Sequence, residues 1–168
     1  LISSTALVKN TGTIMFNGDK NTGIFAKADA NNSGYTIENA GNIAMVGDST
    51  SLSNPNVGIY TEGVNNKIVN TGTISTEDKT VGIFGYEVEN TGNITVGDHA
   101  VGIYSQGKDV TLNAGTITTG QKLSDTEPSI GVYVVGDGQN VYANSGANFV
   151  IGDGSIGISN GNTSGTVG

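Results

Sequence analysis

Residues 88–104 read VENTGNITVGDHAVGIY, and two motifs within this stretch decide the fold. The first motif, apolar-x-Asn-x-Gly-x-Ile, fills 88–94, and the second, Gly-Ile-aromatic, fills 102–104. The first recurs at 8–14, 37–43, 68–74 and, in degraded form, at 111–117 and 142–149. The second begins at Gly23, Gly58, Gly82, Gly102, Gly131 and Gly157, with Val132 in place of Ile in the fifth copy and Ser159 in place of the aromatic residue in the last. Such alternation, with about 20 to 31 residues per repeat, predicts a solenoid, propeller or array.

The composition favours strands over helices. Glycine contributes 27 of the 168 residues, only 35% of the chain is apolar, and cysteine, tryptophan and arginine are absent. The apolar residues are mostly Ile and Val, which favour strands, and they stand in short runs between turn-forming Asn, Gly, Thr, Ser and Asp. No window keeps the i, i+3, i+4 pattern of an amphipathic helix, so we expect no helices.

One repeat contains three short strands joined by bends. In the stretch quoted above these strands cover 94–96, 101–104 and 88–90. Side chains alternate across a strand, so Ile94 and Val96 should share one inward face, and Val101 and Ile103 another. A coil this short closes only around an apolar interior, and stacked coils pair their backbones about 4.8 Å apart. The sequence therefore predicts an all-β, right-handed parallel β-helix (a solenoid) of about six coils of three short strands, with residues 1–168 as one unit without separate domains.

An asparagine stands at an equivalent place in every repeat. The column consists of Asn10, Asn39, Asn70, Asn90, Asn113 and Asn144. We expect these side chains to point inward at a bend, where Asn tolerates the left-handed backbone conformation. Stacked amides can then hydrogen-bond to one another along the axis, as in other in-register arrays. The column therefore has a structural interpretation before a functional one.

The recurring Asn-Thr-Gly-Thr/Asn-Ile and Gly-Ile-Phe/Tyr units, with Gly-Asp turns between them, resemble the passenger region of type V autotransporter adhesins of Gram-negative bacteria. The resemblance covers nearly the whole chain. It implies a β-helical stalk that is exported through the outer membrane, displayed at the cell surface or secreted, and used for attachment to host cells or other bacteria. The family's translocating barrel and signal peptide are not found in these 168 residues, so we expect a segment of a larger surface protein.

The charge pattern restricts the possible partners. Fifteen acids against seven lysines give a net charge of −8. This balance is unsuited to nucleic acid, whose phosphates require a cationic surface, and to anionic membrane surfaces. No apolar run is long enough to span a bilayer, so this segment should not insert into a membrane. The resemblance implies a protein or glycan on a host or bacterial surface as the partner.

Catalysis is the main alternative, because parallel β-helices also carry pectin-degrading lyases and hydrolases. Those reactions use clustered carboxylates on one face, often beside an arginine or lysine. This chain has no arginine, its one histidine is His99 in a turn, and its strands carry Thr, Ser and Ile instead of acids. We therefore expect no catalytic residues, no enzyme activity and no cofactor. A polysaccharide-processing enzyme, a phage tail-spike segment and a purely mechanical spacer are the alternatives.

An aspartate follows the glycine at one corner of most repeats. The column contains Asp19, Asp48, Asp78, Asp98 and Asp153, with Gln121 in the fifth repeat. Stacked carboxylates could hold a divalent cation, but the glycine-rich calcium-binding nonapeptide is missing. We expect each aspartate to cap its own backbone in a solvated turn, and we expect no metal site.

The aromatic column comprises Phe25, Tyr60, Phe84, Tyr104 and Tyr133. Each ring follows an inward Ile or Val, so alternation points it outward. An exposed stripe of rings would suit sugars or a partner surface. The favoured interpretation is that the connection after each ring folds back over it, because large uncovered aromatic stripes are rare on soluble proteins.

Two matched insertions give the sharpest site hypothesis. In most repeats the residue of the aspartate column lies four residues before the glycine of the Gly-Ile-aromatic motif. In the second and fifth repeats it lies ten residues before that glycine, because the insertions 49–56 and 122–129 intervene. Loops on a rigid scaffold often carry binding. Three coils apart, these loops would form two walls about 14 Å from each other, with the short corners between them as a floor. The candidate groove consists of Leu52, Asn54, Asp78, Lys79, His99, Leu123 and Asp125.

Overall fold

The computed structural model describes residues 6–28, 34–136 and 138–161, and this part of the chain is all β. Its strands are β1 Ala6–Asn10, β2 Thr13–Asn17, β3 Thr22–Lys27, β4 Tyr35–Asn39, β5 Asn42–Val46, β6 Val57–Glu62, β7 Lys67–Asn70, β8 Thr73–Ser75, β9 Val81–Gly85, β10 Glu87–Asn90, β11 Asn93–Val96, β12 Val101–Gln106, β13 Val110–Thr119, β14 Ile130–Val135, β15 Val141–Val150 and β16 Ile156–Asn160. The predicted absence of helices is confirmed for the described residues, so they include no helix that could cross a membrane.

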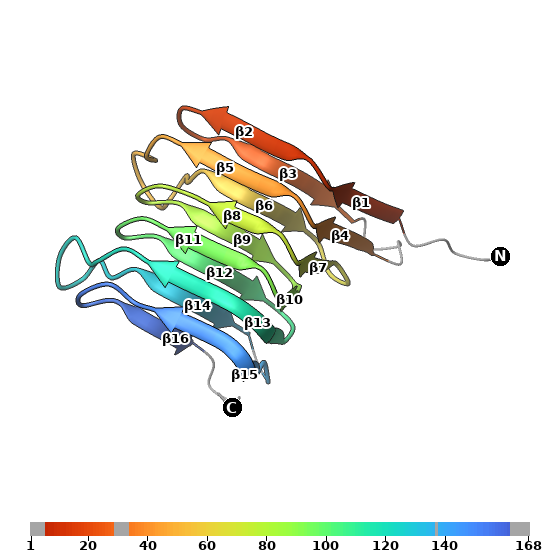
Figure 1. Cartoon of the computed structure of the whole chain (residues 1–168). Helices are drawn as coiled ribbons and strands as arrows, with labels where there is room; N and C mark the ends of the chain where they lie inside the picture. The colour runs from red at the N-terminus through yellow and green to blue at the C-terminus, as the bar shows by residue number, and fades with distance from the viewer. Residues whose placement is uncertain (1–5, 29–33, 137, 162–168) are drawn as a thin grey trace.

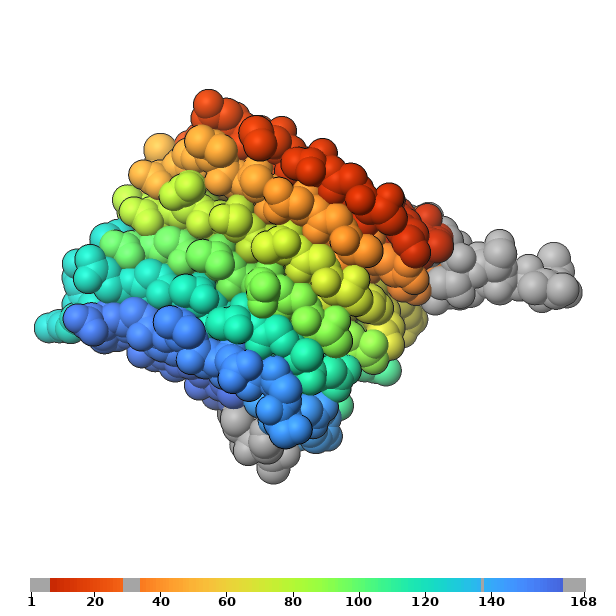
Figure 2. All heavy atoms as spheres, in the orientation of Figure 1, coloured from red at the N-terminus to blue at the C-terminus, as the bar shows by residue number. Residues whose placement is uncertain are grey.

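The strands pair in parallel and form two sheets. Sheet A has the order β1-β4-β7-β10-β13-β11-β8-β5-β2, with β15 also paired to β13, and sheet B has the order β16-β14-β12-β9-β6-β3. Neighbouring strands come from successive repeats and pair in register, so that Val88 lies between Ile68 and Val110. Figures 1 and 2 show the repeats as successive layers, from the red N-terminal end to the blue C-terminal end.

Each of the first four repeats contributes three short strands, as the sequence predicts. In the last two repeats this prediction is wrong, because the first two strands merge into the ten-residue strands β13 and β15. The cause lies at the bend, where Leu112 pairs with Asn90 and takes the inward position of the asparagine column. Without an inward amide to form the bend, the backbone continues as one strand and joins the two halves of sheet A.

The core lies between the two sheets and consists of columns of isoleucine and valine. Its largest members include Ile37, Ile68, Val88, Ile43, Ile74, Ile94, Ile59, Ile83 and Ile103, all with no exposed surface. Ile94 and Val96 belong to this single cluster, which confirms that they share the inward face of their strand. β-Branched side chains stack well in register because each repeat presents the same shape to the next.

The prediction that Val101 and Ile103 share one face is wrong. Ile103 lies in the core, whereas Val101 packs with Val57 and Val81 in a second cluster beside the aromatic rings. The glycine between them departs from strict alternation: a Cβ added to Gly102 would lie 3.1 Å from Cγ2 of the core residue Ile117. Glycine and isoleucine therefore both face the core, and the preceding valine faces outward.

The asparagine column forms a hydrogen-bonded ladder over the first four repeats. Nδ2 of Asn10 donates to Oδ1 of Asn39 (2.8 Å), Asn39 donates to Asn70 (2.8 Å), and Asn70 donates to Asn90 (2.7 Å). The last three side chains are buried, so the predicted inward stack is confirmed for them. Asn113 and Asn144 are exposed instead, and they bond to each other beyond the point where Leu112 interrupts the ladder.

The left-handed backbone predicted for these asparagines is wrong. In the described residues, the non-glycine residues with positive φ are Lys20, Asn65, Lys79 and His99. The bend is held by hydrogen bonds between repeats: the carbonyl of Asn70 accepts from the N–H groups of Thr91 (2.8 Å) and Gly92 (3.1 Å).

The Gly-Asp corners are tied from one repeat to the next. Oδ1 of Asp48 accepts from the N–H of Asp78 (3.2 Å), Asp78 accepts from Asp98 (2.7 Å), and Asp98 accepts from Gln121 (2.8 Å). The prediction that each aspartate caps its own backbone is therefore wrong for these three. The residue after the aspartate supplies the tight turn in the short corners, with φ of 55° at Lys79 and 48° at His99.

Candidate functional site

The outer face of sheet B carries two parallel columns of apolar side chains. One column contains Val57, Val81, Val101 and Ile130, which pair in register across β6, β9, β12 and β14. The other contains the aromatic side chains three residues further along each strand. The three valines are only 5–8% exposed, so the rings and a neighbouring loop already cover much of their surface.

The aromatic rings point outward, as predicted, and pack against one another in sequence. The ring centroids are 5.5 Å apart for Phe25 and Tyr60, 5.0 Å for Tyr60 and Phe84, 4.8 Å for Phe84 and Tyr104, and 5.1 Å for Tyr104 and Tyr133. Stacked and edge-on contacts alternate along the column. Phe25 at the end is 53% exposed, while the other four rings are half-buried.

The first insertion forms a wall beside these columns. It is closed at its base, where Ser49 Oγ accepts from the N–H of Asn56 (2.6 Å) and both residues are buried. Asn56 also accepts from the N–H of Asn21 (2.6 Å) and donates to the carbonyl of Gly18 (2.7 Å). These bonds fix the loop to the preceding repeat, and Leu52 packs onto the valine column.

Together these parts form an open cavity of about 610 Å³ on sheet B, which we call the valine groove. It is lined by Lys20, Thr22, Leu52, Ser53, Asn54, Pro55, Val57, Tyr60, Val81, Phe84, Val101, Tyr104, Ile130 and Tyr133. Its volume and mostly apolar lining are those of a typical small-ligand pocket. The loop that precedes β6 covers the valine column. Residues that follow the rings, among them Glu62, Gly63 and Tyr86, lie beside Tyr60 and Phe84 around a separate hollow, so the expected cover from the following connections is present in part.

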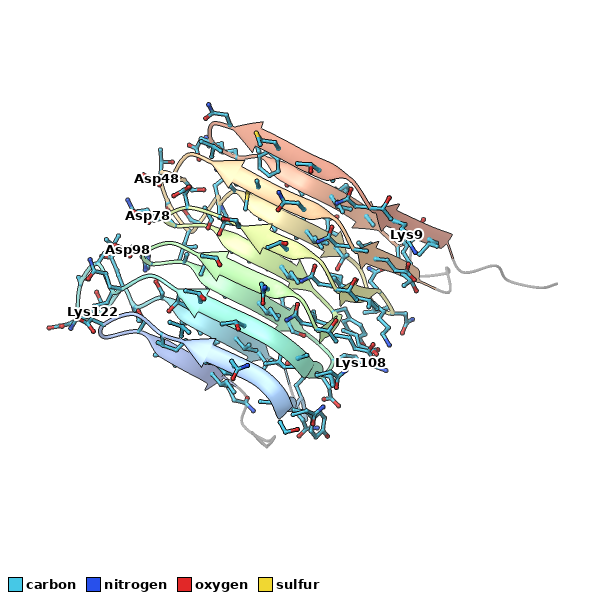
Figure 3. All side chains as sticks on the ribbon, in the orientation of Figure 1. Lys9, Asp48, Asp78, Asp98, Lys108 and Lys122 are labelled. Atoms are coloured by element: carbon cyan, nitrogen blue, oxygen red, sulfur yellow. The ribbon has the colours of Figure 1, made fainter. Side chains whose placement is uncertain are left out.

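Of the seven residues of the predicted groove, Leu52 and Asn54 line the valine groove. Asp78, Lys79 and His99 lie at the short corners, away from its lining. Figure 3 shows Asp48, Asp78, Asp98 and Lys122 along one edge of the molecule, so the two insertions start from the same edge. The structure therefore brings together the first insertion and sheet B, rather than the two insertions and the floor between them.

The second insertion lies beside the short corner of the preceding repeat, next to His99. Glu127 Oε1 lies 3.9 Å from Nε2 of His99, whose side chain is 18% exposed. Lys122 forms an ion pair with Asp125, and Leu123 is 45% exposed. Leu123 and Asp125 therefore lie outside the lining of the valine groove, and the second insertion covers part of the predicted floor.

The valine column, Lys20 and Thr22 line the groove but are not among the predicted site residues, whereas Ser53 and Pro55 lie within the predicted insertion 49–56. A signal for the valines was present, because the residue before each motif glycine is Val57, Val81, Val101, Ile130 or Ile156 in the last five repeats. Strict alternation assigned these side chains to the core. The glycine that breaks the alternation was the feature that could have corrected this assignment.

An ionic cluster lies at the rim of the valine groove. Tyr60 donates its hydroxyl proton to Oε1 of Glu62 (3.2 Å), and Lys27 Nζ lies 3.0 Å from Oε2 of the same carboxylate. The Lys27 ammonium, and then the Tyr60 hydroxyl, hold the pKa of Glu62 below its usual value. Burial, and then the bond to Glu62, raise the pKa of Tyr60, which stays protonated at neutral pH.

A second hollow, of about 560 Å³, follows the Asn-x-Gly bend of sheet A. It is lined by Thr11, Gly12, Thr13, Ala40, Gly41, Asn42, Thr71, Gly72, Thr73, Thr91, Gly92 and Asn93. The stacked glycines form its floor, where a Cβ added to Gly72 would lie 2.0 Å from the carbonyl oxygen of Gly41. This lining offers hydroxyl and amide groups and no titratable side chain.

The described residues contain no cluster of three or more His, Asp or Glu side chains arranged to hold a metal ion. Comparison with known proteins gave no match to a protein-family model, to a curated protein or to a solved structure.

Proposed function

We propose that the stacked repeats form a right-handed parallel β-helix of six coils, and that this solenoid is the extracellular stalk of a bacterial autotransporter adhesin. Parallel pairing of every repeat with the next, in register except for a shift between Leu112 and Ala114 in β13, supports the solenoid. The Asn-Thr-Gly and Gly-Ile-aromatic repeats that resemble autotransporter passengers support the family. The proposed location is the cell surface, after export through the outer membrane, or the medium after release.

We propose that the stalk attaches the cell to a host or bacterial surface through the valine groove and the insertion beside it. The observation that carries this proposal is the open apolar cavity on a rigid face, with a hydrogen-bonded loop as its wall. Apolar surface of this kind on a soluble protein usually marks an interaction site. Loops held by a rigid scaffold are a common place for recognition.

We also propose that the chain is not an enzyme. A polysaccharide lyase or hydrolase would need acids with a cation or base on one open face. The groove lining contains one lysine and no acid, which supports a binding role instead.

A loop-exchange experiment tests the attachment proposal. Residues 49–57, between Asp48 and Gly58, are replaced by Lys-Thr-Val, the tripeptide that separates Asp78 from Gly82 in the third repeat. Fluorescent beads coated with the chain should bind host cells or bacteria, and the exchange should remove most of this binding while the thermal transition remains cooperative. The same exchange at 122–130 is the matched control and should leave binding largely intact. Undiminished binding after the first exchange would contradict the proposal, and so would equal losses from both.

A further inference from the structure

The polar groups of the valine groove are gathered at one end. Lys20 and Thr22 belong to the first repeat, and Ser53 and Asn54 lie in the loop next to them. From Val57 onward the lining is aliphatic or aromatic as far as Ile130 and Tyr133. Thr22 and Ile130 are separated by four strand pairings, so the groove is about 19 Å long at the usual strand spacing.

The charge of the groove is opposite to that of the chain. The chain carries 15 acids and seven lysines, yet Lys20 is the one charged residue among those described in the lining. Its side chain makes no ion pair that the structure records, unlike Lys9, Lys27, Lys67 and Lys122. An anionic group at this end would meet the ammonium of Lys20 and the polar side chains of Ser53 and Asn54.

The remaining lining favours an aliphatic occupant over a saccharide or a peptide. Two of the three phenolic hydroxyls in the lining already have partners: Tyr60 is bonded to Glu62, and Tyr104 accepts from Gln106 Nε2 (3.2 Å). Sugar hydroxyls or peptide amides lying over the valines would lose their bonds to water without replacement, which is unfavourable. A methylene chain has no such groups, and it gains free energy by removing its own apolar surface from water against the apolar lining.

We infer that the valine groove binds a long-chain anionic amphiphile, with its acyl chain along Val57, Val81, Val101 and Ile130 and its acidic head beside Lys20. The carboxylate of a fatty acid and the phosphate of a lipid share this head-group chemistry. The inference rests on the proposed attachment role for its biological meaning, since it names the class of surface component that the groove would take.

The first test is a chain-length series on the purified 168-residue chain. Octanoate, decanoate, dodecanoate and tetradecanoate, below their micelle concentrations, compete with the fluorescent fatty acid cis-parinaric acid. Each added methylene should tighten the Kd by roughly fourfold, the factor that corresponds to about 0.8 kcal/mol of burial. Dodecyl phosphate should bind about as well as dodecanoate if the head group is recognised by charge alone, and a preference for either identifies the source. An affinity independent of chain length would overturn the inference.

Two variants with matched controls locate the ligand. Val81→Phe fills the middle of the groove and should weaken dodecanoate binding at least tenfold, whereas Ile156→Phe, in the same column but outside the lining, should not. Lys20→Gln should weaken dodecanoate but not dodecanol, and Lys79→Gln, at the equivalent corner position of the third repeat, should affect neither. Thermal melts of all four variants show whether each is folded. Retained binding in a folded Val81→Phe variant would show that the amphiphile lies elsewhere.

The outcomes separate this inference from the attachment proposal, because the titrations involve no cells. Fatty-acid binding by beads that do not attach to cells would leave the inference standing and remove the proposed function. If the chain binds no amphiphile but loses cell attachment on loop exchange, the proposed function stands and the inference falls.

Discussion

The buried asparagines stabilise the bend because the amides of Asn39 and Asn70 each satisfy three partners at once. Asn70 accepts from Asn39, donates to Asn90, and lies 3.4 Å from the carbonyl oxygen of Gly72, to which Nδ2 can also donate. Buried polar groups that are fully hydrogen-bonded add specificity at little cost, whereas a single unpaired member is expensive. The ladder therefore fixes the register of the repeats as well as their stability.

We expect Asn70→Asp to destabilise the fold by about 3 kcal/mol or more at pH 7, because an ionised carboxylate has no proton to donate to Asn90 and is fully buried. Burial raises the folded-state pKa of the new carboxyl above its unfolded value, about 3.9. The lost stability should therefore return as the pH falls through the folded-state pKa. Chemical denaturation at several pH values measures this, with Asn144→Asp on the exposed part of the column as the control. Similar losses in the two variants would contradict the argument.

The glycines beside the asparagine ladder have no room for a side chain where another repeat precedes them. Gly12, in the first repeat, does have room. A Cβ at Gly72 would lie 2.0 Å from the carbonyl oxygen of Gly41, but a Cβ at Gly12 would have nothing within 4 Å. We expect Gly72→Ala to cost at least about 2 kcal/mol, because backbone atoms must shift, and Gly12→Ala to change stability by less than about 1 kcal/mol. Thermal denaturation of this matched pair is the measurement. A tolerated Gly72→Ala would show that the repeats can separate locally.

At the residue scale, the sequence predicts the ladder better than the backbone around it. The inward position of Asn39, Asn70 and Asn90 follows from their place two residues after an apolar position. The conformation of the bend does not, because it depends on N–H groups such as that of Gly92 finding a carbonyl in the preceding repeat. The left-handed backbone at Lys79 and His99 could not be predicted from the sequence either, since turn statistics favour Gly or Asn at such positions.

At the element scale, the outer face of sheet B behaves as a small second core. Phe84 lies between Tyr60 and Tyr104, with ring centroids 5.0 and 4.8 Å away, and it packs on the valine cluster. Phe25 has one ring neighbour at 5.5 Å and is 53% exposed. The column is therefore supported in its middle and open at its first member.

We expect Phe84→Ala to cost about 3 kcal/mol in the free energy of unfolding, because it removes ring contacts on both sides and leaves a cavity over the valines. Phe25→Ala should cost less than about 1 kcal/mol. Urea denaturation, followed by tyrosine fluorescence or circular dichroism, compares the two variants. Equal costs would mean that ring packing contributes little and that the valines are protected by another part of the chain.

The site could be predicted only in part at the scale of elements, because it depends on which surface the first insertion packs against. The equal lengths of the two insertions identify both as candidates of equal rank. Both loops are tied to the preceding repeat, the first by Asn56 and the second by Ser129, and the structure distinguishes them through Leu52, which packs on the valines. In the second loop, Leu123 is exposed and Glu127 turns toward His99.

At the scale of the whole molecule, hydrogen bonds between repeats replace the need for ions along the acidic edge. The carboxylates of Asp48, Asp78 and Asp98 each accept an N–H group from the following repeat. These bonds occupy one oxygen of each carboxylate with a backbone donor from the following repeat. Parallel stacking, the apolar columns and the two-motif repeat could all be predicted from periodicity, because each repeat needs the same partners.

We therefore expect divalent cations to be dispensable for stability. Thermal melts in excess chelator and in excess calcium should agree within a few degrees, because the corner carboxylates are occupied by backbone donors. Magnesium in place of calcium is the control for a general ionic effect. A large loss of stability in chelator alone would show that the acidic edge holds a metal ion.

The 20-residue spacing between Asn70 and Asn90 makes this repeat a unit of length. Everything it presents to the next repeat, an amide, a glycine, an isoleucine and a ring, is what it receives from the previous one. Extra copies of 71–90 inserted directly after Asn90 should each lengthen the molecule by about 4.8 Å, one strand spacing. Duplication of this short segment in the gene would therefore change the reach of the protein in fixed steps, because each added repeat moves the end of the molecule by the same distance.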